Sequence, residues 1–354
     1  MSLFNIINKF IKKFDNIIKK RLSKFIIFSF LIMIIINLLN TLNIFNNYIM
    51  QIINISLIYV ILAVSLNLIN GFTGLFSIGH MGFAAIGAYI SATITTLLLK
   101  IRPDSFISYG IFIISVIIGG IIAMLIGIII GFPSLKVKGD YLAIITLAFG
   151  EIIRTILNNI DYVGGPRGLL GIPKFSNFSI IFIFTILTII LIRNIVYSSH
   201  GRALLSIREN EVASELLGIN ITKYKIIAFA IGAFFAGVAG GLLCHLLQIA
   251  HPTQYGFLGS ILILIMVYAG GMGSISGSII AAFVLTFLSE GLRVFLGNLS
   301  NILNFPIGDQ WRMVLYSLLL IFIMLFRSEG LMGMKELKFL IPEEEEKDAK
   351  CSGN

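Results

Sequence analysis

The chain has 354 residues, of which 57% are hydrophobic and only 12% are charged. One soluble core cannot bury that much apolar surface, so soluble globular classes are excluded. The formal net charge of +9 would suggest a nucleic-acid partner in a soluble protein, but the basic residues gather between apolar runs, where they report membrane orientation. The composition predicts an all-α polytopic membrane protein that binds no nucleic acid.

Residues 1–24 form the first predicted unit. They contain seven Lys or Arg, and Ile7, Ile11, Phe14, Ile18 and Leu22 recur at helical spacing between them. A basic amphipathic helix of this kind lies on the anionic inner surface of a bilayer. We therefore expect this segment to contact membrane lipid, with a disordered basic tail as the alternative.

Apolar runs follow along most of the chain, each long enough to cross a hydrocarbon layer of about 30 Å as a helix. We expect about ten transmembrane helices, which together make a permease domain over residues 25–330. The predicted spans are 25–45, 48–70, 80–99, 107–132, 141–158, 178–197, 224–248, 256–272, 274–296 and 311–327. A charged tail, 331–354, ends the chain.

The distribution of Lys and Arg predicts how these spans are oriented. With the amino terminus inside, the cytoplasmic segments carry 18 basic residues and the outer links carry four. Cytoplasmic loops are the richer in Lys and Arg, so both termini and residues 201–225 are expected in the cytoplasm.

The segment "NGFTGLFSIGHMGFAAIGAY", residues 70–89, is rich in glycine. Two interpretations stay open. Glycines let helices pack closely in a membrane. They also permit a broken or re-entrant element that faces a translocation path, where Thr73, Ser77 and His80 would offer hydrogen bonds.

Pairs of oppositely charged residues occur inside two predicted spans. Glu151 and Arg154 stand three residues apart in one, and Glu290 and Arg293 repeat the spacing in another. Each pair is a local ion pair that reduces the cost of charge in the bilayer, or part of a polar vestibule for a zwitterionic solute. As candidates for the translocation path we single out Gly74, Ser77, His80, Thr146, Glu151 and Arg154.

Two further glycine-rich stretches are interpreted structurally. "VGGPRGLLGIP", residues 163–173, predicts an ordered external loop, with a docking surface as the alternative. "YAGGMGSISGSIIAA", residues 268–282, faintly echoes the first glycine segment but contains no phosphate-binding motif. No metal-ligand spacing and no nucleophile beside a base are recognisable, so we expect neither a catalytic nor a metal site.

The most polar interior stretch is "GRALLSIRENEVASELLGINITKYK", residues 201–225. Good helix formers run from Ala203 to Leu217, and Gly218 stands where a left-handed residue ends a helix. The sequence predicts one short helix with an apolar face around Val212 and Leu216. A loop of this length with its own helix needs a partner or a lipid surface to pack against.

This stretch, with the continuation "IIAFAIGAFFAGVAGGL", resembles the LivM-type permease family of branched-chain amino acid ABC transporters. The segments "NLINGFTGLFSIGHMGFAAIGAY", "KVKGDYLAIITLAFGEIIR" and "GGPRGLLGIP" resemble the same family, in the same order. The resemblance covers about residues 50–330. It implies a multi-pass protein of a prokaryotic plasma or inner membrane.

The resemblance also implies the partners: a second related permease subunit, two ABC ATPase subunits and an extracytoplasmic solute-binding protein. It implies import of leucine, isoleucine and valine by alternating access, with ATP and Mg bound by the ATPases. This chain would then be no enzyme and hold no cofactor. The alternatives are import of urea or short amides by the same architecture, and a stand-alone secondary transporter.

By the same resemblance, the cytoplasmic loop 198–223 is a coupling loop that docks into the ATPase. Glu211, Ala213 and Gly218 match the positions of the family's EAA motif, although Gly218 follows Glu211 by seven residues where six is usual. The residues that the resemblance assigns to ATPase coupling are Arg208, Glu211, Ala213, Glu215, Leu217 and Gly218.

Overall fold

The computed structural model describes residues 25–42, 45–99, 101, 105–134 and 141–303, with separate positions between 311 and 337. The chain divides into two units, one of residues 1–46 and 335–354, the other of residues 47–334. In the first, the described part contains the apolar helix Phe25–Thr41. The amphipathic helix predicted over 1–24 and most of the tail predicted over 331–354 lie outside the described residues.

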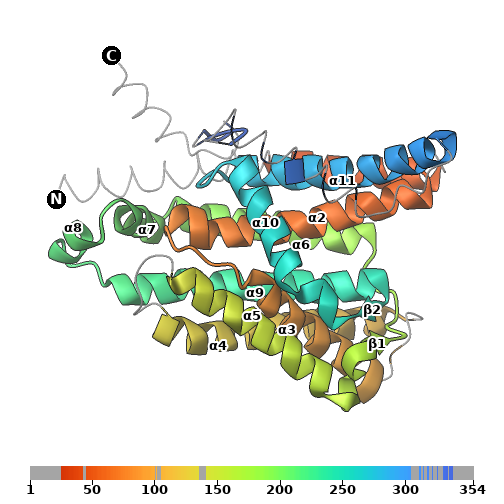
Figure 1. The fold of residues 1–354 in the computed structure, drawn as a ribbon, viewed down its shortest axis with the longest axis horizontal. Helices are drawn as coiled ribbons and strands as arrows, with labels where there is room; N and C mark the ends of the chain where they lie inside the picture. The colour runs from red at the N-terminus through yellow and green to blue at the C-terminus, as the bar shows by residue number, and fades with distance from the viewer. Residues whose placement is uncertain are drawn as a thin grey trace, which may run out of the picture. The chain divides into compact units, whose positions relative to one another are not determined.

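The second unit is a bundle of helices (Figure 1). Its helices are α2 Asn47–Asn67, α3 His80–Ala92, α4 Phe106–Ser134, α5 Tyr141–Asn159, α6 Phe178–Val196, α7 Ser199–Glu209, α8 Glu211–Leu216, α9 Ile221–Leu247, α10 Phe257–Gly270 and α11 Ile275–Leu303. The π-helical turns Leu68–Phe72 and Thr93–Leu98 extend α2 and α3. Short 3₁₀ turns occupy Asp161–Val163, Gly165–Arg167 and Pro252–Tyr255, and the two-residue strands are β1 Leu169–Leu170 and β2 Ile249–Ala250.

Each span predicted up to residue 296 falls on a helix: the first on Phe25–Thr41 and the others on α2 to α6 and α9 to α11. Seven helices of the described part are long and apolar enough to cross a membrane, whereas Phe25–Thr41 and α10 are shorter. The 14 residues of α10 reach only about 21 Å, less than a hydrocarbon layer. The predicted span 311–327 lies mostly outside the described residues, and the total of about ten spans and the side of each terminus stay predictions.

Helix α9 forms the centre of the bundle, between α3 and α4, and small residues allow its close approach to both. A Cβ built on Gly87 of α3 would overlap the backbone of Gly237 in α9, and one on Gly240 would overlap the carbonyl of Ala84. In lipid, where water does not drive helices together, such backbone contact supplies the packing. The close-packing interpretation of the 70–89 segment is confirmed for its helical part.

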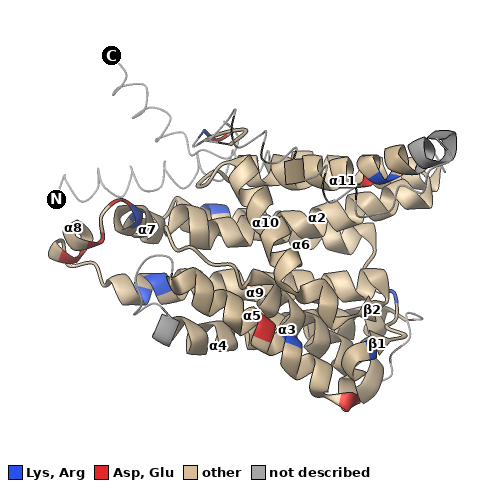
Figure 2. Cartoon of the chain, viewed as in Figure 1, with Lys and Arg blue, Asp and Glu red and all other residues tan. Residues whose placement is uncertain are grey.

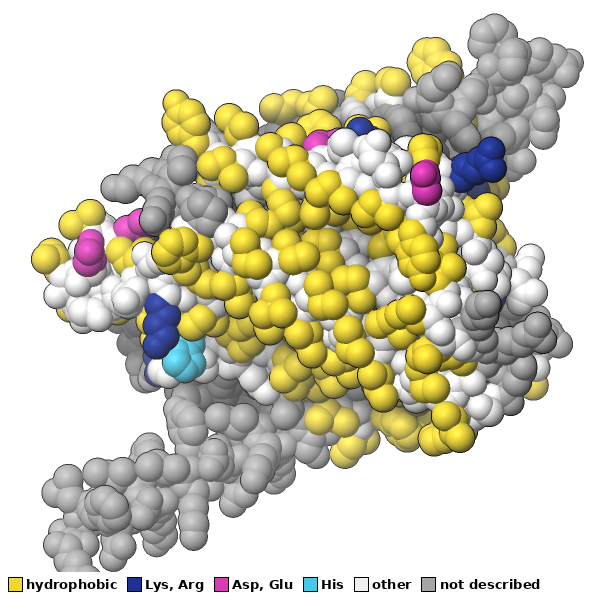
Figure 3. Space-filling view, turned by 90° about the horizontal axis from the view of Figure 1, so that it is seen from below, with side chains coloured by type: hydrophobic (Ala, Val, Ile, Leu, Met, Phe, Trp, Pro, Cys, Tyr) yellow, Lys and Arg dark blue, Asp and Glu magenta, His cyan; other side chains and the backbone are white. Residues whose placement is uncertain are grey.

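The outer faces of the long helices are apolar. Within an 18-residue apolar stretch of each helix, only 33% of the residues of α4 and 17% of those of α5 are buried inside the protein. Figure 3 shows hydrophobic side chains spread over one face of the molecule, and Figure 2 shows few charges along the middle of the helices. These surfaces suit contact with lipid or with other membrane subunits.

Helices α7 and α8 lie at one end of the unit, and β1 and β2 lie at the other (Figure 1). There β1 pairs with β2 in antiparallel register, so the loop predicted over 163–173 is ordered by backbone hydrogen bonds. Gly164 and Gly168 in this loop have φ of 91° and 73°, which glycine adopts without strain. The interpretation as a structural loop is confirmed in its geometry.

Candidate functional site

The second span and the third are joined by a buried break. After the π-helical turn Leu68–Phe72, residues 73–79 are not helical, and α3 begins only at His80. Gly74 has φ of 74°, and the hydroxyl of Thr73 donates 2.8 Å to the carbonyl of Leu68, which ends the helix. The broken element predicted in this segment is therefore present.

Two side chains hold the broken segment in place. Asn70 donates to the carbonyl of Ser77 and accepts from the amide of Ser77, both at 3.2 Å. From α5, the hydroxyl of Thr146 accepts the amide of Ile78 at 3.1 Å. These backbone groups of Ser77 and Ile78 are thereby satisfied inside the protein, as a membrane protein requires.

The amino-terminal ends of α3 and α10 meet at this break. The amide of Met81 donates 3.3 Å to the hydroxyl of Ser260, and a Cβ at Gly259 would come within 3.0 Å of the Met81 side chain. The two helices then diverge. Tyr89 of α3 donates to the carbonyl of Ala250 at the β1–β2 end, whereas α10 leads to Gly273, which lies at the α7–α8 end.

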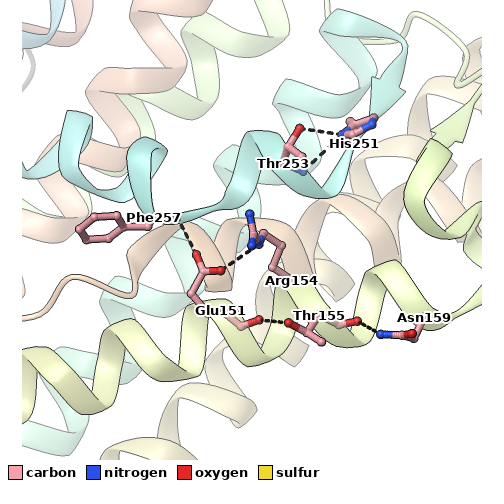
Figure 4. A network of polar contacts seen from close by, with 7 residues as sticks. All are labelled: Glu151, Arg154, Thr155, Asn159, His251, Thr253 and Phe257. Atoms are coloured by element: carbon pink, nitrogen blue, oxygen red, sulfur yellow. Dashed lines mark hydrogen bonds and ion pairs between the residues drawn. The ribbon is translucent and has the colours of Figure 1, made fainter. Parts of the chain in front are cut away.

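Glu151 and Arg154 of α5 lie beside the start of α10 (Figure 4). They form the predicted ion pair at 2.9 Å, and Glu151 also accepts the amide of Phe257 at 3.0 Å. A carboxylate is favourable at a helix amino terminus, where amides lack helical partners. Both side chains are partly exposed, at 31% for Glu151 and 37% for Arg154.

Tyr255 precedes α10 and is almost completely buried. Burial, which penalises the phenolate, raises its pKa well above the usual value. The side chain lies edge-on against the ring of Tyr89. It therefore stays neutral and acts as packing between α3 and the turn that leads into α10.

The predicted path residues do not form one open surface. Ser77, His80 and Thr146 surround the break and are buried, with the Nε2 of His80 at 2.8 Å from the hydroxyl of Ser65. Glu151 and Arg154 lie next to them but reach the surface. Gly74 is the exception, because it packs against Arg208 of α7 instead.

Removing the Thr146 hydroxyl is expected to destabilise the fold. In Thr146→Val the amide of Ile78 loses its acceptor, and an unsatisfied buried donor costs about 1–3 kcal/mol. Thermal unfolding of the purified protein in detergent would show a lower midpoint. Thr155→Val is the matched control on the same helix, since Thr155 is exposed and donates only to its own helix; equal midpoints for the two variants would contradict the role given to Thr146.

Most of the polar stretch 201–225 forms two helices, α7 and α8, and its last residues begin α9, so the prediction of one helix over 203–217 is wrong. Asn210 has extended backbone angles, φ −158° and ψ 109°, and ends α7. Its side-chain oxygen accepts the amide of Ala213 at 3.0 Å and thereby caps α8. Asparagine competes with helical hydrogen bonds in this way, which is why a continuous run of helix formers is divided here.

Helix α8 presents apolar side chains to solvent. Val212, Leu216 and Leu217 are exposed by 68%, 85% and 78%, and Ala213 and Glu215 are exposed too. Gly218 has φ of 81°, and the amide of Ile219 returns to the carbonyl of Ser214, which ends the helix as predicted. We call Val212, Leu216 and Leu217 the α8 apolar patch.

Three side chains hold α8 and α7 to each other and to the rest of the bundle. Ser214 is buried and lies 2.6 Å from the hydroxyl of Ser206 in α7. Glu211 forms an ion pair with Lys225 of α9. Arg208, which the resemblance assigns to ATPase coupling, points inward and donates 2.9 Å to the carbonyl of Gly71, so it links α7 to the broken span.

Sequence reasoning missed Asn67. This buried residue of α2 donates to the carbonyl of Ser274 and the hydroxyl of Ser278, and accepts the amide of Gly273. It joins the end of α2 to the turn between α10 and α11. The signal was an asparagine within an apolar run, which membrane segments retain only where it has a partner.

Comparison with known proteins identifies relatives over most of the chain. Residues 48–324 match the model of a family described as the branched-chain amino acid transport system permease component. The high-affinity branched-chain amino acid transport system permease protein LivM of Escherichia coli K12 is 33% identical over 311 residues, covering 78% of this chain and 68% of that protein. Its Salmonella typhimurium counterpart is 32% identical over the same length.

More distant relatives carry related descriptions. The probable branched-chain amino acid transport permease protein LivM of Methanocaldococcus jannaschii is 24% identical over 337 residues, 83% of this chain and 95% of that protein. The permease protein LivH of Escherichia coli K12, of a high-affinity branched-chain amino acid transport system, is 25% identical over 299 residues, 78% and 92% of the two chains. Similarity thus extends both to permeases described as LivM and to permeases described as LivH.

Proposed function

The chain belongs to the family of branched-chain amino acid transport permeases, and from that premise we propose that it is a membrane subunit of an ABC importer for leucine, isoleucine and valine. ATP hydrolysis in separate ATPase subunits drives alternating access. The chain itself binds no nucleotide. Its partners are two ATPases, a related permease subunit and an extracytoplasmic solute-binding protein.

The observation that carries this proposal is the α8 apolar patch. Three large apolar side chains stand exposed on a short helix at the end of a bundle, in a stretch that is otherwise polar. A protein surface that exposes adjacent apolar side chains among polar ones is typical of a docking site. We assign the patch to contact with an ATPase, which puts the α7–α8 end in the cytoplasm and the β1–β2 end toward the solute-binding protein.

We assign the translocation path to the side of α5 that carries Glu151 and Arg154. One face of α5 is buried, at Leu142, Ala143, Thr146 and Gly150. Thr146 and Gly150 of this face lie against Gly79 and Gly82 at the break. The remaining faces expose residues such as Ile152 and Ile156, which suit a second permease subunit across the path. The partly exposed ion pair offers both charges to the ammonium and carboxylate of a zwitterionic solute.

Uptake by the complete complex in proteoliposomes tests this function. With ATP inside and labelled leucine plus the binding protein outside, we expect uptake that requires ATP and is competed by isoleucine and valine but not by urea. Competition by urea but not by isoleucine or valine would mean that an ABC importer of the same architecture carries urea. Uptake by the purified chain without ATPases would overturn the proposal in favour of a secondary transporter.

A further inference from the structure

We propose that Arg208 transmits movement of the α7–α8 pair to the broken span, as a positioning residue that couples ATPase docking to the translocation path. The inference rests on the proposed function for the identity of the docking partner. Its structural basis is a contact between segments 137 residues apart in the sequence. The family resemblance assigned Arg208 to ATPase coupling, and its side chain is only 18% exposed.

Arg208 caps the end of α2. The last carbonyls of a helix have no helical partner and carry partial negative charge, which favours a cation there. Leu68 and Ile69 are served by Thr73 and by the amide of Leu75. The carbonyl of Gly71 is instead served by Nη1 of Arg208, from another helix.

Two glycines leave the space that the Arg208 side chain occupies. A Cβ at Gly74 would lie 2.8 Å from Cγ of Arg208, and a Cβ at Gly273 would lie 2.9 Å from its Nη1. Both glycines have positive φ, of 74° and 85°. The two glycine-rich segments therefore meet around one arginine, which explains why both contain glycine at these positions.

The segments around Arg208 are joined to one another by hydrogen bonds. Asn67 binds the backbone of Gly273 and Ser274, so the end of α2 and the turn from α10 to α11 are held together. That turn ends α10, whose start lies at Glu151 and beside α3. A displacement of α7 therefore acts on both helices that begin at the break.

Arg208 also binds an exposed carboxylate. Its Nε and Nη2 donate to one carboxylate oxygen of Glu209, at 3.1 and 2.8 Å, and the Glu209 side chain is 71% exposed. A guanidinium can make these bonds and the bond to Gly71 at once, because its donors point along separate directions. A lysine ammonium in the same place lacks that fork.

The experiment uses the complete transporter in proteoliposomes, with Arg208→Met compared against Arg202→Met. Arg202 lies on the same helix α7 and is exposed. Three quantities are measured: ATPase subunits retained on the tagged permease, ATP hydrolysed, and labelled leucine taken up. For Arg208→Met we expect retention and hydrolysis as in the wild type, with leucine uptake per ATP reduced about tenfold or more, the equivalent of one charge-assisted hydrogen bond. For Arg202→Met, an exposed position of the same coupling loop, leucine uptake per ATP is expected to stay as in the wild type.

Two results would overturn the inference: unchanged uptake per ATP in Arg208→Met, or loss of the ATPase subunits, which would make Arg208 a docking residue. If Arg208→Met does not reach the membrane folded, Arg208→Lys and Glu209→Gln decide the matter. Reduced uptake per ATP in Arg208→Lys supports the inference, and wild-type ratios in both variants contradict it. Failure of the wild-type chain to retain any ATPase would instead refute the proposed function.

Discussion

Replacing Leu216 and Leu217 together by aspartate is expected to detach the ATPase subunits and to abolish uptake. Both side chains are largely exposed in this chain, by 85% and 78%. Burial of a leucine in a partner contributes about 1.5–3 kcal/mol, so loss of two would weaken docking by roughly 10² to 10⁴-fold. Co-purification of the ATPases with the tagged permease, at several concentrations, measures the loss directly.

The control for this double substitution is Leu170→Asp. Leu170 is 63% exposed and lies in β1, at the opposite end of the unit. Retention of the ATPases should be unaffected by a charge there. Equal loss from both variants would mean that the effect is general, and full retention in the Leu216 and Leu217 variant would remove the α8 apolar patch from the docking surface.

Substitution of Gly87 by alanine is expected to prevent correct packing of α3 against α9. The added methyl group would overlap the backbone of Gly237, and a backbone cannot move aside as a flexible side chain can. Overpacking of a core ordinarily costs about 1–3 kcal/mol, and a clash with backbone falls at or above the upper end. We expect little monodisperse protein in detergent and a lowered melting midpoint for what remains.

Gly110→Ala provides the comparison. Gly110 is also in a long helix, α4, but nothing lies within 4 Å of a Cβ built there. Alanine is a better helix former than glycine by about 0.8–1 kcal/mol, so this variant should be as stable as the wild type or slightly more so. A Gly87→Ala protein that behaves like Gly110→Ala would show that α3 and α9 do not touch at this point.

Much of the bundle could be predicted from the sequence because its signals are local. Apolar runs give the helices, and the spacing of Glu151 and Arg154 gives an ion pair within one helix. Gly218 marks the end of α8 by its own conformational freedom. Each of these depends on residues only a few positions apart.

What could not be predicted depends on contacts between distant parts of the chain. Arg208 and Gly71 are 137 residues apart, and Asn67 and Ser274 are 207 apart, so no local pattern joins them. The division of the 203–217 segment at Asn210 was missed for another reason. The prediction rested on the helix propensity of these residues and did not include the capping bond of Asn210. In the structure the side chain of Asn210 accepts the amide of Ala213, and the helix is divided there.

The meeting of α3 and α10 has an electrostatic consequence for the break between α2 and α3. A helix start carries roughly half a positive charge, and here two such starts lie side by side at the break. At the start of α10 the carboxylate of Glu151 accepts the amide of Phe257 and offsets that positive charge. The electrostatic field at the break is therefore set by the ends of two helices together with one carboxylate from a third, α5.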